Sequence, residues 1–199
     1  TEAVGIVTQV LSQQMLLLSV VNGLLDLRMC ELGRFEATNE IFSPEEVFEF
    51  VSRMFSQQVK IEKTTLLFSF VPPETFKKAR FARNMKKIPV SHAATLPELL
   101  VGDKTRLTQV LVNLIKNALK FASGKMVRVF ACYEEAEGLL RVHVIDNGAG
   151  IPYIEQRKLF KMHGKLRQTS PENQDGLGMG LKICDTILKE LGGDISLYS

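Results

Sequence analysis

Two asparagines and a lysine recur at regular spacing in the segment Asn113-Leu-Ile-Lys-Asn117-Ala-Leu-Lys120. On a helix, spacings of four and three residues place these side chains on one face. Amide oxygens and an ammonium group on one polar stripe suit a hydrated magnesium ion with attached phosphates. A solvated helix face has the same pattern, so this segment alone leaves both interpretations open.

A carboxylate with two glycines follows an apolar run, in Asp146-Asn-Gly148-Ala-Gly150-Ile151. Glycines let the backbone approach a flat ligand closely, and residues that follow a strand are well placed for binding. The carboxylate can accept a hydrogen bond from an exocyclic amine. An ordinary Asp-Asn-Gly turn accounts for the same residues, and for this motif alone it is the more common case.

A third motif, Gly176-Leu-Gly178-Met-Gly180-Leu181, stands at the start of a helical pattern. The free N–H groups of a helix start attract phosphate. The motif is not a Walker loop because no Lys-Ser/Thr follows it, and no βαβ unit follows as in a dinucleotide-binding fold. A phosphate site is therefore one interpretation among several for this motif alone.

The elements that must position these motifs follow from hydrophobic periodicity and capping signals. Asp103 is the expected N-cap of the helix that carries the asparagines, and Ser43 caps a helix that begins at Pro44. Residues 72–97 fit a loop, an insertion or a short helix. The other predicted helices cover 4–29, 44–60, 153–162 and 178–191, and the predicted strands cover 38–42, 64–71, 127–133, 139–145 and 194–198.

This order predicts an α+β fold, a two-layer sandwich in which helices cover one face of a mixed sheet, preceded by a long N-terminal helix. Val10, Leu17 and Leu24 repeat every seven residues in that first helix, with Val20 and Leu27 beside them. Such a stripe is not stable alone, so the helix needs a partner helix in this chain or in another.

Composition narrows the class of protein. The net charge of +3 is too small to indicate a nucleic-acid partner. The apolar stretch 15–27 is too short and too polar to span a membrane. Three cysteines without CxxC spacing predict buried free thiols in a reducing compartment. The chain starts inside a periodic pattern without a Met, so we expect a fragment of a larger protein.

The order and spacing of the three motifs together resemble the Bergerat-type ATPases, which include histidine kinases, a class of heat-shock chaperones, type II topoisomerases and mismatch-repair ATPases. The segment from Gly102 to Asn113 is similar to the histidine kinase sequence that leads into its N box. Gly192-Gly193 before a final strand is similar to that family as well. Residues 24–33 look like the end of a second dimerisation helix. The resemblance implies a Bergerat fold with a partial dimerisation helix over 1–33 and an ATP-binding catalytic domain over 34–199.

The resemblance also implies roles for single residues. Asn117 holds Mg²⁺, Asn113 and Lys120 act beside the phosphates as catalytic residues, and Asp146 binds the adenine amino group. The remaining implied nucleotide-binding residues are glycines that give the backbone room or wrap the phosphates, two apolar residues that follow them, and a lysine of a mobile lid: Gly148, Gly150, Ile151, Gly176, Gly178, Gly180, Leu181 and Lys161.

The implied activity is that of a cytoplasmic sensor histidine kinase in two-component signalling. Such a kinase transfers the γ-phosphate of ATP to a histidine, from which the phosphate is relayed to an Asp of a response-regulator receiver domain. The implied partners are ATP, the phospho-acceptor domain of the parent chain and that receiver domain. The full protein is expected to be a homodimer, and it could be attached to a membrane. None of His92, His143 and His163 has the surroundings of a phospho-acceptor, so we expect that histidine to lie outside this chain.

Two alternatives stay open. An ATP-hydrolysing machine of the chaperone or mismatch-repair kind shares the fold, but those relatives usually carry a Glu where this chain has Asn113, and an amide cannot activate water. A degenerate kinase that serves only for dimerisation or docking is the second. Phe160 matches the first phenylalanine of the family's F box, whereas His163 stands at the second position.

Overall fold

The computed structural model describes residues 2–79, 96–122, 126–156, 159–160 and 179–199. The chain forms two compact units. Residues 1–40, 102–117 and 149–199 make up unit 1, and residues 41–101 and 118–148 make up unit 2. The helix α4 (Lys104–Ala122) contributes residues to both.

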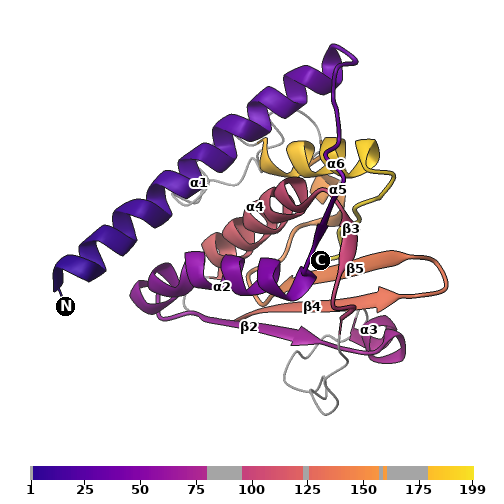
Figure 1. Ribbon diagram of the computed structural model, residues 1–199. Coiled ribbons are helices and arrows are strands. Elements are labelled where there is room, and N and C mark those ends of the chain that lie inside the picture. Colours follow the sequence, from indigo (N-terminus) through magenta and orange to yellow (C-terminus); the bar gives the residue numbers. More distant parts are fainter. Residues whose placement is uncertain (1, 80–95, 123–125, 157–158, 161–178) are drawn as a thin grey trace. The chain divides into compact units, whose positions relative to one another are not determined.

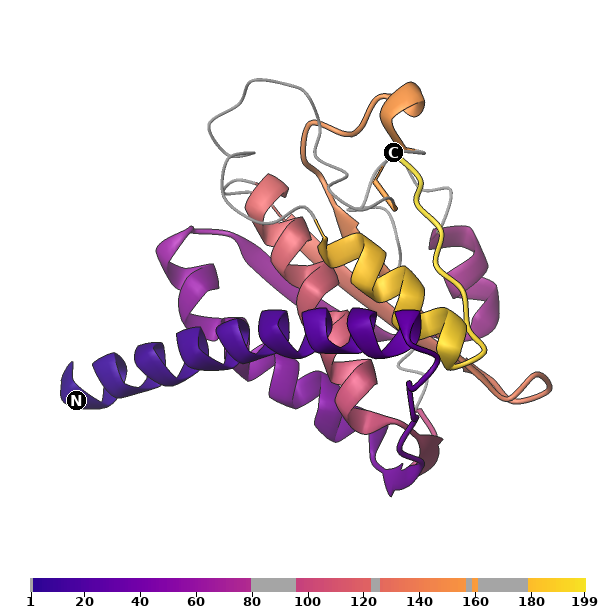
Figure 2. The same ribbon diagram turned by 90° about the horizontal axis from the view of Figure 1, so that it is seen from above.

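Unit 1 is built around α1 (Glu2–Glu31), the first part of α4, and α6 (Gly180–Glu190). The C-terminal half of α1 runs beside α6, and its N-terminal half extends past that helix (Figure 1, Figure 2). The core of this unit is formed by four buried residues: Val110, Ile183, Cys184 and Ile187. Leu27 of α1 is buried as well. The core therefore fixes α6 against the helix that carries the asparagine motif.

The predicted stripe on α1 is confirmed only in its C-terminal half. Leu27 is buried and Val20 and Leu24 are half-buried, but Val10 and Leu17 are 47% and 65% exposed. The helix ends at a glycine cap: Gly33 adopts a positive φ of 64°, and the Arg34 N–H donates to the Met29 carbonyl at 2.9 Å. Among the described residues, no other helix covers Val10 and Leu17.

Unit 2 contains a mixed three-stranded sheet in the order β2-β4-β5. The strand β2 (Thr65–Phe70) runs parallel to β4 (Met126–Glu134), which pairs antiparallel with β5 (Leu139–Asp146). The strands β1 (Glu40–Phe42) and β3 (Leu100–Gly102) form a separate two-stranded sheet. The predicted α+β class with a mixed sheet is thus confirmed, while β3 was not predicted.

Helices lie on both faces of the larger sheet. The helix α2 (Pro44–Ile61) begins at Ser43, whose hydroxyl accepts the Glu46 N–H at 3.4 Å, and it packs Phe48 against Phe68 and Phe70. The short helix α3 (Pro73–Ala79) places Phe76 with Val71 and Phe130. Because Phe130 alternates with the residues that face α2, α3 covers the opposite face. The segment after Pro72 therefore begins with a short helix, one of the three possibilities that its sequence left open.

Two predicted elements differ in the structure. Of the predicted helix 153–162, α5 covers Tyr153–Gln156 and residues 159–160 form a turn, whereas 157–158 and 161–162 lie outside the described residues; residues 194–198 form no strand. A strand needs a ladder partner, and in the described part of the chain these residues have none. Ser199 instead bonds to the loop after Gly150, where its hydroxyl accepts the Ile151 N–H at 2.6 Å.

The three cysteines are free. Burial raises the pKa of the Cys132 thiol to about 11 and that of the Cys184 thiol to about 12, so both are unreactive at neutral pH. Cys30 is half-buried.

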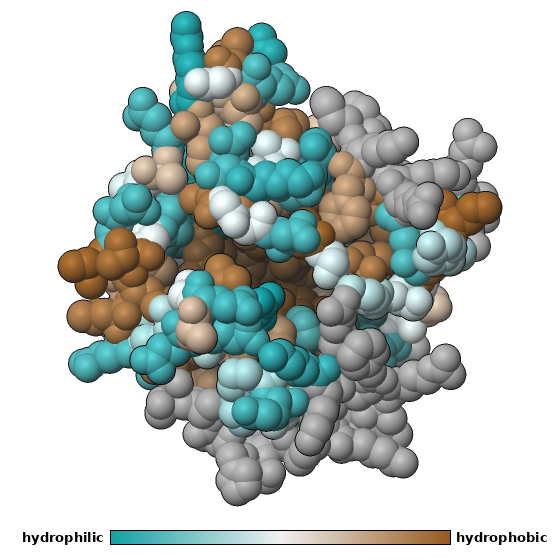
Figure 3. Space-filling model, turned by 90° about the vertical axis from the view of Figure 1, so that its right-hand side faces the viewer, coloured by the Kyte–Doolittle hydropathy of each residue, from teal (hydrophilic) through white to brown (hydrophobic). Residues whose placement is uncertain are grey.

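In the part of the chain that the structure describes, no helix combines the length and apolarity needed to cross a membrane. On the face shown in Figure 3, apolar residues reach the surface in groups among hydrophilic ones.

Candidate functional site

The polar face of α4 forms as predicted. Asp103 caps the helix, since its Oδ1 accepts the Arg106 N–H at 2.8 Å and its Oδ2 accepts the Thr38 N–H at 2.9 Å. Asn113 is buried, and its Nδ2 has no hydrogen-bond partner among the described groups. Buried polar groups are nearly always satisfied, so this amide can donate to a group outside the described residues.

The start of α6 lies beside these amides within unit 1. A Cβ built on Gly180 would lie 3.6 Å from Asn117 Nδ2 and 3.8 Å from Asn113 Oδ1. Met179 is the N-cap residue, and it makes no side-chain capping hydrogen bond. The first-turn N–H groups of α6 are thus free of a side-chain cap, next to an unsatisfied amide donor. Helix-start N–H groups and amide donors together suit a phosphate.

The Asp146 motif forms a tight turn in unit 2. Asp146 ends β5, and its Oδ1 accepts the Gly148 N–H at 2.8 Å. A Cβ on Gly148 would lie 2.6 Å from the Phe121 carbonyl oxygen, a contact that real Cβ atoms do not make, so only glycine fits. Asp146 is exposed, and the described contacts leave its Oδ2 for another donor. The turn therefore presents one fixed carboxylate to solvent.

The next predicted residues follow in unit 1. Gly150 has a positive φ of 78°, which favours glycine, and a Cβ there would lie 3.1 Å from Ser199 Oγ. Ile151 is half-buried and tied to Ser199, as described above. Ser199 and the Phe121 carbonyl, which shape these two glycine turns, were not predicted. Sequence offers no signal for them, because each acts through a tertiary contact.

For the remaining predicted site residues, the structure gives few contacts or none. Lys120 is half-buried, with its Nζ 5.6 Å from the centre of the Phe121 ring, and Leu181 is half-buried in the first turn of α6. The glycines and the lid lysine of the predicted phosphate cradle lie outside the described residues: Gly176, Gly178 and Lys161. No group of three or more His, Cys, Asp or Glu side chains among the described residues is arranged to hold a metal ion.

Comparison with known proteins defines the class. Residues 102–199 match the family described as histidine kinase-, DNA gyrase B- and HSP90-like ATPase. This part of the chain therefore belongs to that family. The chain is homologous to sensor histidine kinases. It is 30% identical over 195 residues to the sensor histidine kinase RcsC of Salmonella typhimurium, which covers 98% of this chain but only 18% of RcsC.

Solved structures share the fold. Full-length ShkA in complex with AMPPNP matches 88% of this chain and 31% of its own, with a TM-score of 0.63 and 23% identity. The histidine kinase ThkA in complex with the response regulator protein TrrA matches 87% of this chain and 42% of its own, with a TM-score of 0.52 and 18% identity. The predicted Bergerat-type architecture is thus confirmed.

Proposed function

We propose that this chain is the ATP-binding kinase domain of a sensor histidine kinase and that it transfers the γ-phosphate of ATP to a histidine outside this chain. The observation that carries the proposal is the placement of Asn113, Asn117 and Gly180, where unsatisfied amide and helix-start donors converge. Family membership over residues 102–199 supports ATP as the ligand of these donors.

Each residue has a role in this proposal. Asp146 accepts a hydrogen bond from the adenine amino group through Oδ2, since Oδ1 already holds the Gly148 N–H. Gly180 and Leu181, in the first turn of α6, donate backbone N–H groups to the phosphates, and Gly150 and Ile151 shape the loop that follows Asp146. Catalysis then rests on positioning and on charge neutralisation.

The residues present fit a magnesium ion bound together with the nucleotide rather than held by a protein cage. Mg²⁺ keeps several waters and commonly takes one or two protein ligands plus phosphate oxygens. Asn117 is the proposed protein ligand through its amide oxygen. Once bound, the ion would neutralise phosphate charge. Asn113 and Lys120 would donate to phosphate oxygens, and Lys161, Gly176 and Gly178 complete the proposed set.

The partners follow from the class. The homologue ThkA was solved with a response regulator, so we propose a receiver domain as the phosphate acceptor in the relay. We propose residues 1–33 as the end of a dimerisation domain and residues 34–199 as the catalytic domain. The exposed apolar residues of α1, Leu18 and Leu25 among them, support a helical partner in the full homodimer.

An Asp146→Asn substitution tests the adenine contact. We expect it to weaken AMPPNP binding at least about tenfold, because a charge-assisted hydrogen bond contributes about 1.5–3 kcal/mol and 1.4 kcal/mol is tenfold. Isothermal titration calorimetry measures the affinity. Asp194→Asn, at another exposed aspartate, is the matched control and should bind as the unchanged chain does. Failure of the unchanged chain to bind nucleotide would instead support the degenerate docking module.

An Asn117→Ala substitution tests the metal role. We expect Mg-ATP binding to weaken more than the binding of ADP in EDTA, because only the first uses the amide oxygen as a metal ligand. The ATP-hydrolysing alternative is not favoured by the homology, and it predicts steady phosphate release by the chain alone. Equal weakening in both titrations would remove Asn117 from the metal site.

A further inference from the structure

The strand β2 leaves one edge of the larger sheet open. In the described residues it pairs only with β4. The Val71 N–H, directly after β2, donates to the Ala131 carbonyl at 2.9 Å, so odd-numbered residues of this strand face β4. Because backbone groups alternate along a strand, the N–H and C=O groups of Leu66, Phe68 and Phe70 point away from the sheet. Those groups are available to another strand.

The residues of the open edge lack the side-chain features that usually protect an edge strand against pairing. Natural edge strands are blunted by charged side chains, proline or bulges. The residues Thr65–Phe70 include no charge and no proline, and their register with β4 is unbroken. The strand at the other end of the sheet differs, since β5 carries Arg141 and Asp146. An uncharged, regular edge of this kind is typical of a strand that is covered by another chain.

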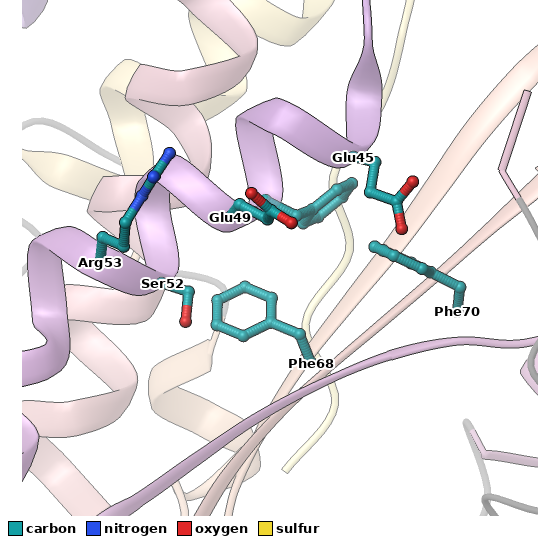
Figure 4. Close-up of a pocket in the computed structure, with 7 residues that line it drawn as sticks. Glu45, Glu49, Ser52, Arg53, Phe68 and Phe70 are labelled. Atoms are coloured by element: carbon teal, nitrogen blue, oxygen red, sulfur yellow. The ribbon is translucent and has the colours of Figure 1, made fainter. Parts of the chain in front are cut away.

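A groove lies along this edge within unit 2. It has a volume of about 450 Å³ and is lined by residues of α2 and β2: Glu45, Phe48, Glu49, Ser52, Arg53, Phe68 and Phe70. The ring of Phe48 meets Phe68 and Phe70 edge-on, with centroids 6.2 and 5.4 Å apart. Figure 4 shows Glu45, Glu49 and Arg53 following one another along α2, above the rings of Phe68 and Phe70. A strand added to β2 would pack its side chains into this groove.

The charges of the groove are self-complementary. Glu45, Glu49 and Arg53 are spaced by four residues on the outer side of α2, and among the described residues none of them is in an ion pair. If two β2 strands pair antiparallel, the two α2 helices also run antiparallel. A two-fold axis near the level of Val51 then sets Glu49 of each copy opposite Arg53 of the other. Ser52 is small enough to let the helices approach there.

We propose that the β2 edge and its groove form an interface between two copies of this chain. The strands pair antiparallel about a two-fold axis, so that the same surface serves both copies and the sheet becomes continuous across them. Because the groove carries both signs of charge, a partner that repeats them in reverse order, such as a second copy, fits it better than a peptide of one sign. The interface is independent of nucleotide binding and of α1.

Sedimentation equilibrium of the whole chain tests this interface through a charge exchange. We expect a dimer whose dissociation constant rises about tenfold or more in Glu49→Arg and in Arg53→Glu, since each places like charges in contact. The double variant restores opposite charges and should return to within about threefold of the unchanged chain. All four proteins are checked by circular dichroism, and both positions are exposed, so folding is not at risk.

A proline variant tests the strand pairing itself. The Leu66 N–H points away from β4, so Leu66→Pro removes a donor from the open edge without breaking the existing sheet. We expect it to abolish the dimer, whereas Leu66→Ala, which loses the same side-chain contacts, should retain it. Leu25→Lys on α1 reports any association through that helix and so separates it from association through the β2 edge. A chain that stays monomeric at several hundred micromolar, a dimer lost only on Leu25→Lys, or a double exchange that fails to recover association would each overturn the proposal.

Discussion

Two ion pairs of nearly equal length behave in opposite ways. In unit 1, Arg106 donates to Asp26 at 2.6 Å, and in unit 2, Arg141 donates to Glu134 at 2.7 Å. Burial raises the pKa of Asp26 above its ordinary value, with the Gln109 amide and Arg106 opposing the rise. The hydrogen bond from Arg141 lowers the pKa of Glu134. The distance between charges therefore does not determine which effect wins.

The surroundings of each carboxylate explain the difference. Asp26 faces one cation, its side chain is 6% exposed, and the nearby Asp103 carboxylate also disfavours its charge. The Glu134 side chain is nearly as buried, at 9% exposed, but it has a second cation in Lys77 at 3.5 Å, and Arg141 is 41% exposed where Arg106 is 22% exposed. With one mostly buried cation, Asp26 does not recover the cost of desolvation, whereas the two more exposed cations beside Glu134 keep much of their hydration and still favour its charge.

Removal of the Asp26 carboxylate should give the largest effect on stability. Asp26→Ala leaves the mostly buried Arg106 without its counter-charge, so we expect a loss of about 2–4 kcal/mol, slightly below the range for fully buried pairs. Urea denaturation followed by circular dichroism measures it. Glu31→Ala is the control on the same helix. Within the described part of the chain Glu31 pairs with Arg28 alone, which is exposed, so the loss should stay below about 0.5 kcal/mol.

The combined substitution Asp26→Leu with Arg106→Met sharpens this test. Apolar replacement of a whole buried pair is often neutral or stabilising, so the double variant should recover most of what Asp26→Ala loses. If it instead loses as much as Asp26→Ala, the uncompensated charge is not the cause, and the packing of α1 against α6 becomes the better explanation.

This ion pair also shows where sequence reasoning stopped. Periodicity, apolar runs and caps predicted α2, β2, β4 and β5 to within about two residues and the start of α4 at Asp103, because these signals are local in sequence. Asp26 interrupts an apolar stripe on α1, so sequence alone gives no reason to expect it buried. Its partner Arg106 is 80 positions away, and only the packing of α1 in unit 1 brings them together.

In the candidate site, too, some features could be predicted from sequence and others could not. Asn113, Asn117 and Gly180 could be proposed together because the family motifs are local in sequence, and the structure places them close together. The Phe121 carbonyl that excludes a side chain at Gly148 belongs to no motif and is a backbone atom, which carries no residue-specific signal. Residues 194–198 have the composition of a strand, but a strand also needs a neighbouring strand to pair with. The sequence of the segment alone does not specify that neighbour.

Removal of the Glu134 charge should have a smaller effect than removal of Asp26. In Glu134→Gln, Arg141 keeps its contact with Glu137 at 2.6 Å and remains partly solvated, so no cation is left buried alone. We expect a lower stability than the unchanged chain but a smaller loss than in Asp26→Ala, measured by the same urea titration. A loss as large as that of Asp26→Ala would erase the contrast between the two pairs.

Acidification should affect the two pairs in opposite directions, and this is the smallest effect. The pKa of Glu134 in the folded chain lies below its ordinary 4.5, so its contribution to stability is complete above pH 4.5 and is lost as pH falls through the folded value. The pKa of Asp26 lies above its ordinary 3.8, so between these values the folded chain binds the extra proton and gains stability as pH falls. Hydrogen exchange at pH 6 and pH 4, corrected for intrinsic rates, separates the amides of β4 and β5 from those of α1. Glu134→Gln should abolish the acid-induced loss in the strands and leave α1 unchanged, because each carboxylate acts on the elements that it joins.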